Sequence, residues 1–279
     1  MRRCNVFVRH ATSWILDRMR YKIVDVFSDK PLQGNALCVV LDECDPELMP
    51  RIAREVNLSE TTFPVVTGPD SYTMRIFTTQ EEFPFAGHPS LGTAWALGAQ
   101  RWTQTTSGAV VTVEATSNEA WMSQPVPMFA DVENLDEIAA ITGISEVRRV
   151  IHMTSGGLTF LTVLTDDSLA NVIPSERKFA DLLRGTSALG LAIANIESKD
   201  ELSVRVFFPG DAVFEDPGTG SLAGPLGALV HTEYGMSREL TVKQGDFVSR
   251  PCRINVIADP NNLQIGGSVT LCAEGEFII

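Results

Sequence analysis

The stretch "EEFPFAGHPSLGTAWALG" (residues 81–98) places a histidine between a glycine and a proline, directly before a run of small and apolar residues. Residues 89–99 predict a helix that is apolar all round, and such a helix is normally buried. His88 therefore stands at the N-terminus of an expected core helix, which Pro89 is suited to begin. We call the residues at such a helix N-terminus its mouth. Either His88 only caps this helix, or it faces a ligand there.

A second stretch of the same kind is "FEDPGTGSLAGPLGALV" (residues 214–230). Small residues allow backbone N–H groups to approach a ligand, and a helix N-terminus carries partial positive charge, so this mouth suits a carboxylate or a phosphate. In the simpler interpretation, Asp216 before Pro217 is an ordinary N-cap. The residues that open this helix are Gly218, Thr219, Gly220 and Ser221.

The two stretches indicate an internal duplication. Arg75-Ile-Phe77 precedes the first helix, Arg205-Val-Phe207 precedes the second, and the two triplets lie 130 residues apart. This order predicts two similar halves, each a curved antiparallel sheet rolled around one buried helix, although an unrelated two-domain α+β protein is also compatible with it. If the halves face each other, their mouths share a cleft with His88 and Asp216 in corresponding places, and ligand sites favour such interfaces.

Further helices and strands follow from local signals. "LDEIAAITG" (135–143) and "SERKFADLLRG" (175–185) predict helices that end at glycine. "INVIAD" (254–259) and "SVTLCAEGEFII" (268–279) predict the closing strands.

Glu60, in "EVNLSETTFPVV" (55–66), begins an expected apolar strand. Most glutamates are solvated. Partial burial of this one would raise its pKa and make it a usable general acid or base.

Composition limits the classes of function. The 279-residue chain is 44% hydrophobic and 20% charged, which is sufficient to form a hydrophobic core. Its formal net charge of -13 makes binding of nucleic acid unfavourable, because an acidic surface repels phosphates. No apolar run approaches the roughly 20 residues of a membrane span. The odd number of cysteines and the lack of a CxxC pair predict reduced thiols in a cytoplasmic protein. No metal-ligand spacing is visible, so we expect no metal.

The first 18 residues differ from the remainder. They hold four arginines and one acid, Asp17, which is weakly compatible with a mitochondrial presequence. We expect them to be an extension outside the fold.

Four segments together resemble the phenazine-biosynthesis PhzF-like isomerase family, in order and over essentially all of residues 19–279. They are "YKIVDVF…GNALCVV" (21–40), "AREVNLSETTFPV" (53–65), "RIFTT…EEFPFAGHPSLGTAWAL" (75–97) and "EDPGTGSLAGPLGALV" (215–230). The resemblance implies a diaminopimelate epimerase-like α+β fold, in which two halves, each a β-barrel-like sheet around a central helix, enclose the active site between them. It also implies a homodimer and no cofactor.

The resemblance assigns roles to individual residues. The family's glutamate, which shuttles a proton between carbons of a cyclic dienol acid, falls on Glu60. The family's histidine falls on His88, its aspartate on Asp216 and its serine on Ser221, and these groups orient the substrate. Glu60, His88 and Asp216 form the expected catalytic set. Gly87, Thr219 and Gly220 complete the expected substrate-binding set.

Related epimerases and racemases use two cysteines as opposed bases, and at the matching places stand Gly87 and Asp216. This difference disfavours two-thiol racemisation and favours isomerisation by one carboxylate. The sequence also departs from the family pattern: Phe83 replaces a usual leucine, Phe208 replaces the alanine of "FAPG", and Gly218 replaces the alanine of "EDPATGS".

The sequence thus predicts a cofactor-independent isomerase that acts on a small carboxylate-bearing substrate, with no nucleic-acid or membrane partner. Its alternatives are a non-catalytic ligand-binding or protein-interaction member of the same fold, and an epimerase or racemase with non-thiol bases. The expected boundaries are an extension at 1–18, a first half at 19–125 and a second half at 126–279. The last strands of the second half could return to the first half.

Overall fold

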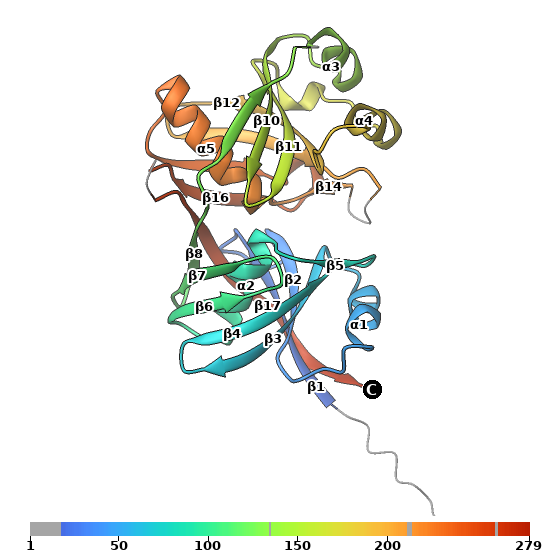
Figure 1. Cartoon of the computed structure of the whole chain (residues 1–279), viewed down its shortest axis with the longest axis vertical. Coiled ribbons are helices and arrows are strands. Elements are labelled where there is room, and N and C mark those ends of the chain that lie inside the picture. Colours follow the sequence, from blue (N-terminus) through green and yellow to red (C-terminus); the bar gives the residue numbers. More distant parts are fainter. Residues whose placement is uncertain (1–17, 134, 211–213, 260–261) are drawn as a thin grey trace, which may run out of the picture.

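The computed structural model describes residues 18–133, 135–210, 214–259 and 262–279. Figure 1 shows two lobes along the long axis of the molecule, with β8 and β17 running between them. The N-terminal lobe holds β1 (Arg18–Val26), β2 (Asn35–Val40), α1 (Met49–Val56), β3 (Glu60–Gly68), β4 (Ser71–Phe77), β5 (Glu82–Phe83), α2 (Gly87–Leu97), β6 (Arg101–Thr105), β7 (Val110–Ala115) and β8 (Glu119–Ser123).

The strands of the N-terminal lobe close into a ring around α2. They pair in the order β1-β2-β3-β4-β6-β7-β8, and β17 (Gln264–Ile278) pairs with both β8 and β1 to complete the ring. Small residues let the strands approach the helix closely. A Cβ on Gly92 would lie 2.7 Å from Leu37 Cδ2 and 2.9 Å from Val26 Cγ2, so a larger residue would push the wall away.

The C-terminal lobe repeats this arrangement around α5, with strands in the order β9-β10-β11-β12-β13-β15-β16-β17. In the described residues this second ring stays open between β9 and β17. The elements are β9 (Met128–Asp131), α3 (Leu135–Thr142), β10 (Val147–Ser155), β11 (Leu158–Thr165), the 3-10 turn η1 (Leu169–Asn171), α4 (Glu176–Leu183), β12 (Gly190–Ile196), β13 (Glu201–Phe207), β14 (Glu215–Asp216), α5 (Gly220–Tyr234), β15 (Glu239–Gln244), the 3-10 turn η2 (Asp246–Val248) and β16 (Cys252–Ile257).

The strands of the two lobes follow the same pairing pattern, whereas α3 has no counterpart in the described part of the first lobe. The parallel pairs β2–β3 and β4–β6 of the first lobe recur as β11–β12 and β13–β15 in the second. A two-residue strand, β5 or β14, precedes each central helix. The predicted fold class is therefore confirmed: an α+β molecule made of two similar halves, each a rolled sheet around one helix.

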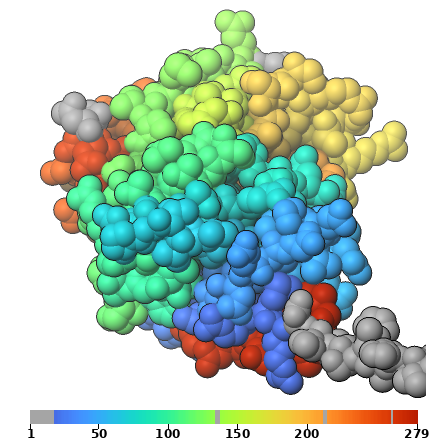
Figure 2. Space-filling model, turned by 60° about the horizontal axis from the view of Figure 1, so that its bottom comes forward, coloured from blue at the N-terminus to red at the C-terminus, as the bar shows by residue number. Residues whose placement is uncertain are grey.

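β17 joins the two lobes. Its first residues pair with β16 and β8, and residues from Val269 onward pair with β1. Figure 2 shows the blue N-terminal and red C-terminal residues together at one end of the molecule. Arg18, the last residue of the expected extension, belongs to β1 and pairs with Ile278, whereas residues 1–17 lie outside the described residues.

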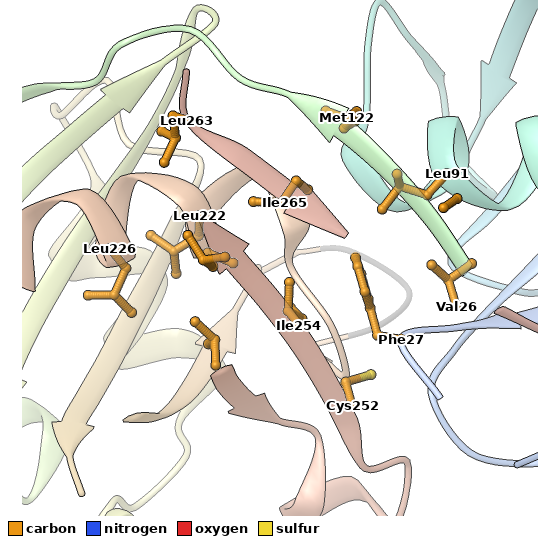
Figure 3. Close-up of a cluster of buried hydrophobic side chains, with 14 of the residues drawn as sticks. Val26, Phe27, Leu91, Met122, Leu222, Leu226, Cys252, Ile254, Leu263 and Ile265 are labelled. Carbon is orange, nitrogen blue, oxygen red and sulfur yellow. The ribbon is translucent and has the colours of Figure 1, made fainter. Parts of the chain in front are cut away.

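The hydrophobic core is continuous across the lobes. One cluster of buried side chains includes Leu91 of α2 and Leu222 of α5. Figure 3 shows the Phe27 ring between Val26 of the first lobe and Ile254 of the second. Phe27 is 1% exposed and has a left-handed backbone (φ 67°), so tight packing holds an unfavourable conformation at the junction.

Candidate active site

The N-termini of α2 and α5 meet head to head. An ideal Cβ on Gly87 would lie 3.2 Å from the backbone nitrogen of Ser221. The first four N–H groups of a helix have no intrahelical acceptor, and both helix ends carry partial positive charge. Two sets of donors from opposite lobes therefore face the same small volume.

A cleft of about 90 Å³ opens at this meeting point. All seven residues expected from the sequence line it: Glu60, Gly87, His88, Asp216, Thr219, Gly220 and Ser221. Its apolar wall comes from both lobes and consists of Leu58, Phe83, Phe85, Leu158, Phe160, Leu189 and Phe208. Among the described residues that line it, none is lysine, arginine or cysteine. An anionic group here would therefore meet backbone amides and neutral side-chain donors such as Ser221, and no described residue of the lining offers a thiol base.

Glu60 and His88 form the ionisable centre of the cleft. Glu60 begins β3 and His88 is the second residue of α2, and Glu60 Oε2 lies 3.3 Å from His88 Nε2. The side chains are 13% and 6% exposed. Burial lowers the pKa of His88 from 6.5 to about 3, because the imidazolium loses its hydration. At neutral pH the site thus contains a neutral imidazole beside a carboxyl group.

Asp216 lies on β14, and both of its carboxylate oxygens accept hydrogen bonds. Asn35 Nδ2 donates to Oδ1 at 2.9 Å, and the Thr219 hydroxyl donates to Oδ2 at 2.6 Å. Gln244 holds this corner by accepting from the Thr219 backbone N–H at 2.9 Å and donating to the Asp216 carbonyl at 2.8 Å. Thr219 thus supports Asp216, and its N–H is not available to a ligand.

The strand pairing corrects the expected equivalence of His88 and Asp216. Phe83 pairs with Ile76 in the first lobe as Asp216 pairs with Val206 in the second, and each lies four residues before its helix. Asp216 therefore corresponds to Phe83, and His88 corresponds to Ser221. The sequence did not reveal this because a two-residue strand is too short to show a periodic pattern.

Asn35 is the site residue that sequence reasoning missed. It begins β2, it is fully buried, and its amide reaches His88, Asp216 and Gly218. The signal available in the sequence was a polar residue between Gly34 and the apolar strand "ALCVV". A buried amide requires hydrogen-bond partners, but the sequence does not show that they come from the other half.

The three departures from the family pattern lie on this cleft. Phe83 and Phe208 belong to its apolar wall, and the ring of Phe208 lies 5.9 Å from that of Phe160 in an edge-to-face arrangement. At Gly218, a Cβ would lie 2.8 Å from Cys252 Sγ and 3.1 Å from Phe27 Cδ2. Figure 3 shows Cys252 and Phe27 together at this place. Alanine does not fit here without movement of these neighbours.

The match to a family model decides the family. The model described as "Phenazine biosynthesis-like protein" covers residues 24–275. The chain belongs to the phenazine biosynthesis-like protein family. It is 32% identical to trans-2,3-dihydro-3-hydroxyanthranilate isomerase of Pseudomonas aeruginosa, with 92% of this chain and 98% of that protein covered.

Solved structures show that the fold is shared. A PhzF-family phenazine biosynthesis protein of Bacillus anthracis superposes with a TM-score of 0.83 at 24% identity, covering 95% of this chain and all of the other. A hydroxyproline epimerase of Agrobacterium vitis shares the fold alone, with a TM-score of 0.65 at 10% identity and 95% and 94% coverage.

This protein is an isomerase, the class of enzyme for which several of its curated relatives are named. In the described part of the chain, no cluster of His, Cys, Asp and Glu side chains has the arrangement of a metal site. No helix there is long and apolar enough to cross a membrane.

Proposed function

We propose that the protein is a cofactor-independent isomerase that moves a proton between two carbons of a small, ring-bearing carboxylate, with Glu60 as the general acid and base. The observation that carries this proposal is the Glu60–His88 pair, 3.3 Å apart, beside two facing helix N-termini.

The cleft supports binding of an anionic ligand with an apolar body. The free amides at the start of α2 and α5 suit a carboxylate, which needs donors and favours positive helix ends. The phenylalanine-rich wall suits an unsaturated ring, because aromatic side chains pack against such rings edge to face or in offset stacks. Asp216 and the Ser221 hydroxyl then orient polar substituents, and Gly87 leaves room for the substrate.

The chemistry follows from a single carboxylate. Glu60 removes a proton from one carbon, the negative charge spreads through the conjugated acid, and Glu60 returns the proton to another carbon. The imidazole of His88 stays neutral and polarises the substrate or the carboxyl group by hydrogen bonding. Racemisation needs a base on each face of one carbon, whereas this transfer needs one base that reaches two carbons.

The first substrate to test is trans-2,3-dihydro-3-hydroxyanthranilate, because the Pseudomonas aeruginosa relative is named for its isomerisation. Glu60→Gln keeps the shape of the side chain and removes the basic oxygen. We expect turnover to fall by about 10²–10⁴-fold with little change in melting temperature. Glu55→Gln, on the exposed face of α1, is the matched control and should leave turnover unchanged.

Turnover by Glu60→Gln within about threefold of the unmodified protein would show that Glu60 is not the proton shuttle. If the unmodified protein binds this acid without converting it, the non-catalytic binding alternative is supported instead.

We further propose that the protein works as a homodimer, as its family resemblance implies, and that it is cytoplasmic, because its odd number of cysteines and lack of a CxxC pair favour reduced thiols. Sedimentation equilibrium at micromolar concentration tests the dimer. A monomer under these conditions would contradict it.

A further inference from the structure

Asn35 stands where the two lobes meet, and its backbone is held from both sides. It follows Gly34, whose carbonyl accepts from Arg250 Nε at 2.9 Å and whose N–H donates to the Pro251 carbonyl at 3.1 Å. Arg250 is in turn paired with the fully buried Asp25 at 2.5 Å. The position of the Asn35 side chain is therefore set by both lobes and not by a mobile loop.

The orientation of the Asn35 amide is unambiguous. Its nitrogen lies 2.9 Å from Asp216 Oδ1 and 3.0 Å from the Gly218 carbonyl oxygen, while its oxygen accepts from the Ser59 hydroxyl at 3.4 Å. A carboxylate and a carbonyl can only accept hydrogen bonds, so the NH₂ group must face them.

The same NH₂ group lies 3.3 Å from Nδ1 of His88, a third and longer contact that can only share one of the two hydrogens already directed at Asp216 and Gly218. Burial keeps His88 neutral, so one ring nitrogen carries a proton and the other carries a lone pair. A proton on Nδ1 would place two donors against each other in a buried site. A proton on Nε2 leaves Nδ1 free to accept and places the Nε2–H group 3.3 Å from Glu60 Oε2, although these two atoms are not hydrogen-bonded to each other in this structure.

We propose that Asn35 is a positioning residue that selects the Nε2-protonated tautomer of His88, so that the carboxyl group of Glu60 faces a hydrogen-bond donor. Because the same amide holds Asp216, one buried side chain of the first lobe aligns the polar groups of both mouths. This inference deepens the proposed function and rests on it for the role of Glu60. In other histidine-dependent enzymes, the wrong tautomer lowers turnover by orders of magnitude.

The experiment reads the imidazole directly and needs no substrate. The protein is labelled with ¹⁵N-histidine, and long-range ¹H–¹⁵N spectra distinguish protonated from unprotonated ring nitrogens. Disappearance of one set of signals in His88→Gln assigns His88 among the four histidines. We expect a protonated Nε2 and an unprotonated Nδ1 at neutral pH. A proton on Nδ1 in the unmodified protein would overturn the proposal.

Asn35→Asp provides the perturbation. The oxygen that replaces Nδ2 keeps a lone pair for the ring whether or not the new carboxyl group is protonated, so we expect the ring proton to switch from Nε2 to Nδ1. Gln104→Glu is the matched control, because Gln104 is also a buried amide beside α2 but donates to Ser90. It should leave the tautomer of His88 unchanged.

Retention of the Nε2 proton in a folded Asn35→Asp protein, or the same switch in Gln104→Glu, would contradict the selection by Asn35. If Asn35→Asp does not fold, Asn35→Ala replaces it, and a mixture of both tautomers is expected. A pure Nε2 tautomer in Asn35→Ala would also overturn the proposal. The turnover assay of Glu60→Gln tests the proposed function, whereas the histidine spectra test the selection of the tautomer by Asn35. The two results can therefore be distinguished.

Discussion

The two lobes contain the same arginine–glutamate clamp in different surroundings. Arg75 pairs with Glu82 through two hydrogen bonds of 2.7 and 2.6 Å, and Arg205 pairs with Glu215 through two of 2.9 and 2.7 Å. In each lobe the clamp connects the long strand to the two-residue strand before the helix. The side chains of the first pair are 41% and 36% exposed, those of the second only 7% and 10%.

The difference lies in what covers the second clamp. Arg205 also donates to the carbonyl of Leu169, and its guanidinium lies 5.2 Å from the Phe207 ring centroid and 4.4 Å from that of Phe247. Arg75 has one such ring, Phe77, at 5.0 Å. The same local sequence pattern therefore yields the same bidentate arginine–glutamate geometry in both lobes. The contribution of each pair to stability depends on the residues that pack over the pair. The buried clamp ends next to Asp216, so it also supports the site.

The largest expected difference is in the buried clamp. Arg205→Met leaves the Glu215 carboxylate buried without its cation, and we expect the free energy of unfolding to fall by about 3–5 kcal/mol. Urea denaturation measures it. Arg205→Met combined with Glu215→Leu should recover most of the loss, because no buried charge remains. A loss below about 1 kcal/mol in the single variant would mean that the two clamps are equivalent.

The second difference is pH dependence, because the first mouth carries His88 where the second carries Ser221. The folded pKa of His88 lies below its unfolded value, so at low pH the unfolded chain binds a proton that the folded protein does not. Above pH 6.5 the free energy of unfolding, compared with that of His88→Gln, does not depend on pH. At pH values below 6.5 it decreases by about 1.4 kcal/mol for each pH unit. Denaturation midpoints of both proteins between neutral pH and pH of about 4.5 test this. Parallel pH profiles would show that His88 is not held neutral.

The third prediction concerns Gly218, which corresponds to Phe85 of the first lobe. Gly218→Ala places a Cβ against Cys252 Sγ and Phe27, and we expect a loss of about 1–3 kcal/mol from overpacking. Cys252→Ala removes the sulfur, so the double variant should lose less than the sum of the single variants. Additive losses in thermal denaturation would contradict a direct clash between positions 218 and 252.

The smallest effect is expected at the exposed clamp. Arg75→Met should cost about 0–1 kcal/mol, and the cost should shrink at high salt, because solvent and ions screen a half-exposed pair. Denaturation at low and high salt measures it. A salt-independent loss as large as that of Arg205→Met would show that exposure does not distinguish the clamps.

Much of the fold could be predicted from the sequence. The helices that end at Gly143 and near Gly185 are α3 and α4, and the small-residue runs after His88 and Thr219 are α2 and α5. A glycine with positive φ at 143 and a run of buried alanines and glycines are local signals, set by backbone sterics and by the helical period. Six of the seven site residues followed from motifs around the two helix starts, and Glu60 followed from the "NLSET" motif at the start of β3.

Other features were decided by the tertiary structure. Asn35 lies 181 positions before Asp216, and no local pattern connects the two. The expectation that the last strands return to the first half named no strand partners, whereas the structure pairs β17 with β1 and β8. The burial of Arg205, the head-to-head meeting of α2 and α5, and the equivalence of Asp216 with Phe83 likewise depend on which strands pair. Periodicity in a sequence reports which face of an element is apolar, because it reflects the geometry of one helix or strand. It does not report the partner of that face, since contacts between distant residues arise only when the whole chain packs.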